Sequence, residues 1–125
     1  MHKVLVLGQN PGNRSFKKKD GKPNTASAIG RLYEWMTEIG VNTYSFHNVC
    51  YQTGKVTKKD IDYELLKTVT SGYERVIALG EFASYALTKI GVDHFKLPHP
   101  SGLNRQINDK SFVKQKLKEC KKYYD

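Results

Sequence analysis

Short apolar runs alternate with helical patterns along the whole of this chain. Residues 2–7, 43–48, 74–79 and 94–97 have the length and the apolar or aromatic content of strands. Between them, and after the last, apolar residues recur at helical spacing. Strands that alternate with helices run parallel, because each crossover returns the chain to the same end of the sheet. The sequence therefore predicts an α/β protein, a three-layer α/β/α sandwich around a four-stranded parallel sheet with right-handed crossovers.

Capping residues and glycines predict where the helices begin and end. Thr25 or Ser27 is a suitable cap for the first helix, and Gly40 is suited to end it. Thr57–Asp60 has the pattern of a capping box, with Asp in the usual place of Glu, and predicts a helix that opens there. The last helix is expected to begin near Asp109.

Length and composition narrow the class of protein. A chain of 125 residues with 38% apolar residues suits a single domain with one core. No apolar run approaches the roughly 20 residues of a membrane span, and we expect no signal peptide at the N-terminus. Cys50 and Cys120 lack a metal-ligand spacing and are expected to be reduced thiols. These features favour a cytoplasmic protein that does not enter a membrane.

The net charge of +9 is the most unusual bulk property of the chain. Lysines cluster in three places: residues 17–19; residues 55, 58 and 59; and residues 114, 116, 118, 121 and 122. Clusters of this kind suit a polyanionic partner such as nucleic acid. They also suit a solvated, lysine-rich surface, so charge alone leaves both interpretations open.

Two loops rich in Gly, Pro, Asn and Ser directly follow predicted strands. They are Gly8–Gly12 near the start of the chain and His99–Arg105 near its end. Because parallel strands all end at the same edge of a sheet, we expect both loops to gather at one rim with Asn48 and Gly80. Open α/β sheets bind their ligands at this rim.

Three polar residues of the rim are candidates for chemistry. The amide of Asn10 could orient a water or bind a ligand carbonyl. His99 lies between two prolines, which restrict its backbone, and could donate to a carbonyl or an oxyanion. Asn48 offers a donor and an acceptor that match the imide edge of a pyrimidine. Each also has a plain structural explanation, as a turn residue, a loop histidine and the end of a strand.

The second loop also carries groups suited to DNA. Ser101 and the neighbouring backbone amides could hold a phosphate. Leu103 is an apolar tip in a polar loop and could wedge between bases. Neither loop is a P-loop or a dinucleotide fingerprint, because the required Gly-Lys-Ser/Thr and Gly-x-Gly-x-x-Gly patterns are missing.

Together these segments resemble the uracil-DNA glycosylase superfamily. Gly8-Gln9-Asn10-Pro11-Gly12 is similar to its first motif, in the form with Asn that is found in the mismatch-specific and single-strand-selective families. The second motif resembles His99-Pro100-Ser101-Gly102-Leu103-Asn104-Arg105, whose Ser-Gly-Leu is most similar to the mismatch-specific family. Phe46-His47-Asn48 is similar to the segment that supplies a base-reading Asn. The resemblance implies one glycosylase-like domain over residues 1–125, with strand order 2-1-3-4.

The resemblance also implies a mechanism without any metal or organic cofactor, on DNA and as a monomer. A nucleotide flips out of the helix, Asn10 positions the attacking water, and His99 stabilises the departing base. The residues implied around the base are Gly8, Gln9, Pro11, Gly12 and Asn48. Those implied to contact the DNA are Ser101, Gly102, Leu103, Asn104 and Arg105.

Two departures from the family pattern affect the expected chemistry. The aromatic ring that stacks on the flipped base is missing from residues 22–27, and Phe16 is the candidate substitute. No Asp stands at position 10 or 13, so the strongest water-activating group is absent. The cysteines of the iron–sulfur families are missing too, and no cluster is expected.

Three hypotheses therefore follow from the sequence. The first is a DNA glycosylase acting on uracil or a related pyrimidine, which leaves an abasic site. The second is a member of the same fold that binds DNA or a modified base without cutting. The third is an α/β enzyme that acts on free nucleotides, for which binding would lack a steep dependence on salt.

Overall fold

The computed structural model describes residues 2–11, 18–19, 22–23, 28–101 and 104–125. The chain forms two compact units, each built from two separate segments. The sheet unit comprises Met1–Asn13 and Thr43–Leu97, and the helical unit comprises Arg14–Asn42 and Pro98–Asp125. Both units therefore join residues that lie far apart in the sequence.

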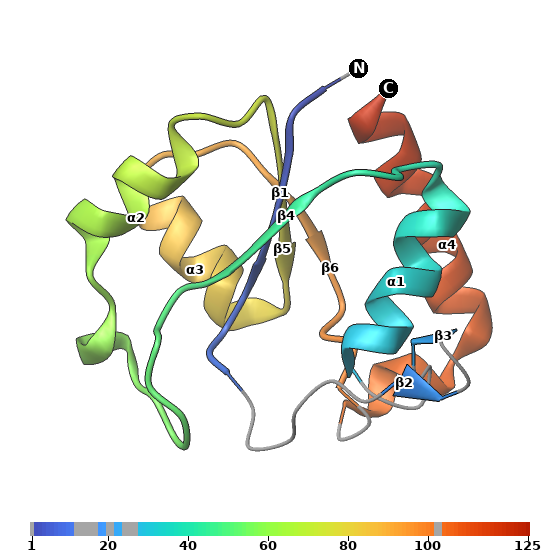
Figure 1. Ribbon diagram of the computed structural model, residues 1–125, viewed down its shortest axis with the longest axis horizontal. Helices are drawn as coiled ribbons and strands as arrows, with labels where there is room; N and C mark the ends of the chain where they lie inside the picture. Colours follow the sequence, from blue (N-terminus) through green and yellow to red (C-terminus); the bar gives the residue numbers. More distant parts are fainter. Residues whose placement is uncertain (1, 12–17, 20–21, 24–27, 102–103) are drawn as a thin grey trace. The chain divides into compact units, whose positions relative to one another are not determined.

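The sheet unit contains four parallel strands: β1 (Val4–Gly8), β4 (Ser45–Asn48), β5 (Arg75–Leu79) and β6 (Phe95–Leu97). They are ordered β4-β1-β5-β6 (Figure 1), which is 2-1-3-4 when these strands are counted along the chain. All five residues of the central strand β1 are buried, as is typical of parallel sheets. The predicted α/β class and strand order are confirmed.

Two helices of the sheet unit, α2 (Tyr63–Thr70) and α3 (Glu81–Lys89), pack on one face of the sheet (Figure 1). The core between them is formed by alternate residues of the two central strands and by apolar residues of the helices. Its members include Leu5, Leu7, Val76, Ala78, Leu66, Ala83 and Leu87. The strand residues that alternate with this set, Val4, Val6, Ile77 and Leu79, are buried as well. This continuous burial explains why the strands have uninterrupted apolar runs.

The predicted start of α2 is wrong by one short turn. The carboxylate of Asp60 accepts hydrogen bonds from the backbone N–H of Thr57 (2.7 Å) and from its hydroxyl (3.3 Å), as a capping-box residue does. This pair opens only the 3₁₀ turn η1 (Lys58–Asp60), because Ile61 is extended (φ −78°, ψ 123°). The helix begins at Tyr63, where Asp62 accepts the N–H of Leu65 at 3.1 Å.

The helical unit is formed mainly by α1 (Ala28–Ile39) and α4 (Lys110–Tyr124), which pack against each other (Figure 1). Its buried residues include Leu32, Trp35, Met36, Ile39, Leu117 and Cys120. α1 ends at Gly40, whose φ of +85° favours glycine. The side chain of Asp109 caps α4 by accepting the N–H of Phe112 at 3.0 Å. The candidate caps Thr25 and Ser27 lie outside the described residues.

The helical unit also contains two short elements that the sequence does not predict. Lys18–Lys19 (β2) pairs antiparallel with Lys22–Pro23 (β3), and Arg105–Asn108 forms the 3₁₀ turn η2. Backbone pairs of this length carry no hydrophobic periodicity, so the sequence around them resembles a plain polar loop.

Both cysteines are free thiols and buried. Burial raises the pKa of Cys120 to about 12, because an apolar environment disfavours the thiolate. Among the helices in the described part of the chain, none combines the length and the apolar character that a bilayer span requires.

Candidate functional site

The first glycine-rich loop is held against the segment that follows β4. Gly8 and Asn48 are direct neighbours in the parallel register. Beyond the strands the pairing continues, since Val49 N–H donates to the carbonyl of Gly8 (2.9 Å) and Cys50 N–H to that of Gln9 (3.0 Å). The structure therefore brings Gly8, Gln9 and Asn48 together at the carboxyl edge of β1 and β4.

Gly8 provides bare backbone that two side chains approach closely. A Cβ atom on Gly8 would lie 2.7 Å from Oδ1 of Asn48 and 3.1 Å from Cζ of Phe46. The first distance is below any normal contact, so no side chain fits here without moving Asn48. The edge of β4 thus presents an aromatic ring and an amide side by side over the end of β1.

Phe46 is a residue of this edge whose role the sequence did not reveal. Its side chain is 41% exposed although it is a large apolar group. Phe46 and Asn48 are two positions apart in one strand, so they project from the same face of the sheet. That alternation is a usable sequence signal, but the exposure of the ring is decided by the fold.

Asn48 has a half-buried side chain with no hydrogen-bond partner among the described residues. A primary amide carries two N–H donors and an acceptor oxygen. A ligand with alternating carbonyl and N–H groups could therefore pair with it without displacing any interaction described in the protein.

The amide of Asn10 is oriented by two backbone carbonyls. Its Nδ2 donates to the carbonyl of Gln52 at 3.0 Å and to that of Gly54 at 2.7 Å. Carbonyl oxygens only accept, so this end of the amide must be the NH₂ group, and Oδ1 is the end that remains. The side chain therefore presents a hydrogen-bond acceptor whose direction is set by the loop after β4.

His99 is held in the neutral form by burial and by a backbone donor. The N–H of Ser101 donates to Nδ1 of the ring at 3.1 Å, so Nδ1 carries no proton. Burial lowers the pKa of His99, because desolvation disfavours the charged imidazolium. The proton of the neutral ring is then on Nε2, which makes that nitrogen a hydrogen-bond donor.

A second histidine shows what a purely structural arrangement looks like. In His94 both ring nitrogens are used, Nδ1 with the carbonyl of Val92 and Nε2 with the hydroxyl of Ser84, each at 2.8 Å. Nδ1 must donate to the carbonyl, so Nε2 accepts from Ser84. His99 differs, since within the described residues only its Nδ1 has a partner.

Asn104 braces the loop that carries His99. Its Nδ2 donates to the carbonyl of His99 (2.9 Å), and its Oδ1 accepts the N–H of Gln106 (3.1 Å). The Asn104 N–H also donates to the carbonyl of Ser101 (3.0 Å), and the Arg31 guanidinium donates to the carbonyl of Pro100. The backbone around His99 is thus fixed by contacts within the helical unit.

The structure describes only some of the other predicted site residues. Pro11 is half-buried, and Arg105 is exposed in η2. Gly12, Phe16, Gly102 and Leu103 lie outside the described residues. Their predicted roles, like that of Arg105 on phosphate, stay predictions.

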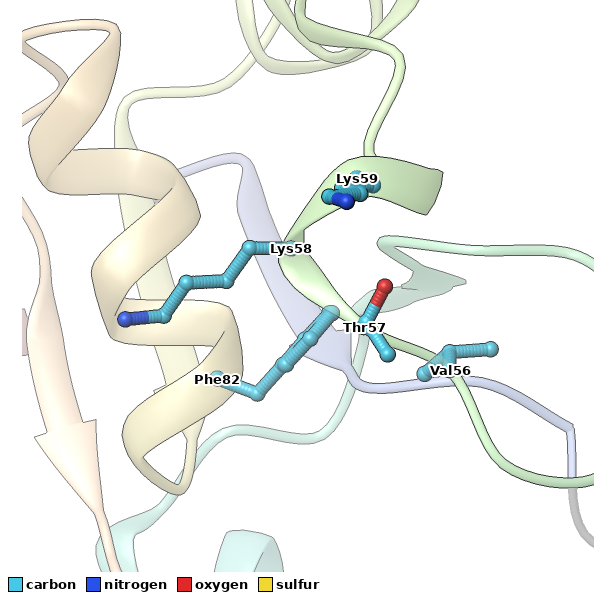
Figure 2. Close-up of a pocket in the computed structure, with 5 residues that line it drawn as sticks. All are labelled: Val56, Thr57, Lys58, Lys59 and Phe82. Carbon is cyan, nitrogen blue, oxygen red and sulfur yellow. The ribbon is translucent and has the colours of Figure 1, made fainter.

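A groove lies in the sheet unit, between residues 56–59 and the first turn of α3 (Figure 2). It is lined by Val56, Thr57, Lys58, Lys59 and Phe82, and its volume is about 520 Å³. The sequence indicates the basic cluster that contains Lys58 and Lys59. It does not pair that cluster with Phe82, because the ring comes from the first turn of α3.

The described residues contain no group of three or more His, Cys, Asp or Glu side chains that could hold a metal ion.

A comparison with protein families adds an independent observation. The family model described as the uracil DNA glycosylase superfamily matches residues 1–121. No curated protein and no solved structure matches the chain.

Proposed function

The chain belongs to the uracil DNA glycosylase superfamily, and on this premise we propose that it hydrolyses the N-glycosidic bond of uracil or a related modified pyrimidine in DNA. Membership supports a DNA glycosylase type of function. The base and the activity itself are the proposal, as are action as a monomer, an abasic product and a cytoplasmic location. The target nucleotide is flipped out of the helix, because its glycosidic bond is not accessible within the stack.

Asn48 and Phe46 recognise the base in this proposal. The amide of Asn48 pairs with the alternating carbonyl and N–H groups of a pyrimidine imide edge. Phe46 offers an exposed ring next to that amide, on which a base can stack. It takes the role of the ring that is missing from residues 22–27, and Phe16 is then not needed for it.

His99 stabilises the leaving group. The bond between C1′ and the base nitrogen breaks, and the electron pair departs with the base, which becomes an anion. Nε2–H of His99 donates a hydrogen bond to the developing charge on the base O2. A neutral imidazole suits this role because it donates without first losing a proton, and the base takes its proton from water after release.

The orientation of Asn10 is the observation that carries the proposal. Because Gln52 and Gly54 occupy its NH₂ group, the remaining oxygen can accept a hydrogen bond from the attacking water. The water oxygen bonds to C1′, and its proton passes to bulk water, since an amide is too weak a base to take it. We therefore expect slower hydrolysis than with a carboxylate at this position.

A panel of labelled oligonucleotides tests the proposal. The panel contains U:G, U:A, single-stranded uracil, hydroxymethyluracil and thymine mismatches, and alkali converts each abasic site into a strand break. We expect breaks with at least one substrate, and none above background with the Asn10→Ala, His99→Ala double variant. Breaks that are equal for the wild type and the double variant on every substrate would overturn the proposal.

A second candidate function is favoured by the same amide. Asn10 cannot remove a proton from water, so the site suits a protein that binds a flipped base without releasing it. In that case the protein binds modified DNA more tightly than unmodified DNA, and no abasic product accumulates. The oligonucleotide panel, combined with a binding measurement, separates the two functions.

A further inference from the structure

The groove of Figure 2 has the chemistry of a nucleotide-binding surface. Its apolar part consists of Val56, which is buried, and the ring of Phe82, which packs partly against the core and extends from α3 toward Thr57. Lys58 and Lys59 belong to the same segment as Val56 and supply positive charge, and the side chain of Lys58 extends toward α3 (Figure 2). Aromatic rings stack on bases of any sequence, and ammonium groups bind the phosphates between them.

The charge at this groove is only partly compensated. The ammonium group of Lys58 lies 4.0 Å from the centre of the Tyr85 ring, and that of Lys89 lies 5.6 Å from the same centre. These cation–π contacts hold two charges in place without neutralising them. Lys59 has no ion-pair or ring partner among the described residues.

Two acidic groups lie near the groove. Glu81 forms a salt bridge with Lys96. The carboxylate of Asp60 accepts hydrogen bonds from the backbone N–H and the hydroxyl of Thr57, a lining residue, so its negative charge stays at the groove and offsets one of the two lysines there. One positive charge is left in excess, which suits a single phosphate.

The groove is connected to Asn10 through one short loop. Gln52 and Gly54, whose carbonyls hold the Asn10 amide, lie four and two residues before Val56 in the chain. Both features belong to the sheet unit, so their relative position is set by this loop. A DNA strand that reaches Asn10 is thereby brought close to the groove.

We propose that this groove binds one nucleotide of the substrate strand next to the flipped nucleotide, with its base on Phe82 and its phosphate at Lys59. The assignment rests on the proposed function for its place next to the target. The volume of about 520 Å³ is large enough for one nucleotide. The groove is lined by only five residues, so we expect it to hold a nucleotide as part of a strand and not as a free monomer.

The experiment measures binding without chemistry. A fluorescent single-stranded oligonucleotide without uracil is titrated by anisotropy at several salt concentrations with the full chain and three variants. Phe82→Leu keeps the apolar contact and removes the ring, and we expect affinity to fall about fivefold or more. Lys59→Gln should reduce the slope of log affinity against log salt by about 0.7.

Lys67→Gln is the matched control. This exposed lysine of α2 is paired with Glu64 at 3.3 Å and does not line the groove. It removes the same charge as Lys59→Gln, and we expect the salt slope and the affinity to stay at wild-type values. Thermal unfolding of each variant checks folding, and if Phe82→Leu does not fold, the exposed Lys59 decides the outcome.

Base release from a uracil-containing oligonucleotide is measured in parallel. Failure of the proposed groove can then be distinguished from failure of the proposed glycosylase function. Weaker binding by Phe82→Leu and Lys59→Gln, with Lys67→Gln unchanged, supports the groove whether or not base release occurs. Equal binding by all four proteins overturns it, even if uracil is released. A loss that is the same for Lys59→Gln and Lys67→Gln also overturns it, because it reflects only net charge.

Discussion

The two glycine- and proline-rich loops hold their polar residues by different means. Asn10 is oriented by carbonyls of Gln52 and Gly54, which belong to a segment far away in the sequence. His99 is oriented mainly by its own loop, through Ser101 and Asn104. One arrangement depends on tertiary structure, whereas the other is largely local.

This difference predicts which substitutions disturb the orientation of Asn10 and which disturb that of His99. A change anywhere in the loop after β4 should disturb Asn10, even where it leaves the fold intact. His99 should respond mainly to changes of its own ring and its immediate neighbours.

The ring of His99 should have the largest effect on base release. Loss of a donor aimed at developing negative charge typically costs roughly a hundredfold to a thousandfold in rate. We expect His99→Ala to lower the single-turnover rate by that factor and to leave DNA affinity nearly unchanged. A variant that keeps more than half of the wild-type rate would exclude His99 from the chemistry.

A methyl group on Gly8 should displace the base-reading amide. In Gly8→Ala the new Cβ would lie 2.7 Å from Oδ1 of Asn48, so the amide must move. Loss of one such hydrogen bond costs about 1–3 kcal/mol, which corresponds to a decrease in kcat/KM of roughly 5-fold to 160-fold. Gly72→Ala is the control, because a Cβ there meets nothing within 4 Å. Equal activity of both variants would contradict the close approach.

A carboxylate in place of Asn10 should destabilise the protein. In Asn10→Asp both donors to the carbonyls of Gln52 and Gly54 are lost, and a negative charge faces two acceptors. We expect the free energy of unfolding at neutral pH to fall by about 1–2 kcal/mol. The loss should be smaller in acid, where a protonated carboxyl can donate to one carbonyl. Chemical denaturation measures this loss of stability. Unchanged stability together with faster base release would show that the carbonyls of Gln52 and Gly54 do not orient the side chain at position 10.

Two glycines with the same backbone conformation separate the effect of backbone strain on stability from the effect of the Gly54 carbonyl on the position of Asn10. Gly54 and Gly40 both have φ of +85°, and a Cβ on either meets nothing within 4 Å. Alanine at each should cost a similar amount of stability, about 1 kcal/mol, because left-handed backbone disfavours L-residues. Only Gly54→Ala should also reduce base release, by several fold, since its carbonyl holds Asn10. A similar rate for the two variants would refute the link between this loop and the chemistry.

The smallest effect concerns acid stability. In the unfolded chain a histidine has a pKa of about 6.5, whereas burial lowers the pKa of His99 in the folded state. Between the two values the unfolded state binds more protons, so stability falls as the pH decreases through this window. The wild type should therefore lose more thermal stability than His99→Gln between about pH 7.5 and 5.5.

Glu74 does not obscure this comparison. The hydrogen bond from the Lys3 backbone is the main cause that lowers the pKa of Glu74, so this carboxyl titrates at more acidic pH. The same pH dependence in the wild type and in His99→Gln would show that His99 is not desolvated in the folded protein.

Much of the fold could be predicted because the strands are buried and continuous. The runs at 2–7 and 74–79 became β1 and β5 with boundaries shifted by one or two residues. The start of α2 could not be placed, because Thr57–Asp60 and Asp62 both offer valid caps and the extended Ile61 decides between them. Short-range patterns indicate which caps are possible, whereas packing selects one of them.

The candidate site was predictable only in part. Asn10 and His99 stand out because they are polar residues that follow strands and lie beside Pro, and Asn48 stands out because it is a polar residue at the end of a strand. Phe46 did not stand out, since an aromatic residue in a strand normally indicates the core, and Phe82, which does pack against the core, gave no sign that it also lines a groove. Whether such a ring is covered or exposed depends on what the rest of the chain places over it.

Local patterns were enough to predict the order of strands and helices along the chain, the basic charge and the residues that end the strands. These properties follow from local patterns of apolar residues, glycines and lysines. Which end of the Asn10 amide is free, which nitrogen of His99 carries the proton and whether the ring of Phe46 is exposed all depend on the folded chain. These depend on carbonyls, backbone N–H groups and neighbours that come together when the chain folds, and no local pattern specifies them.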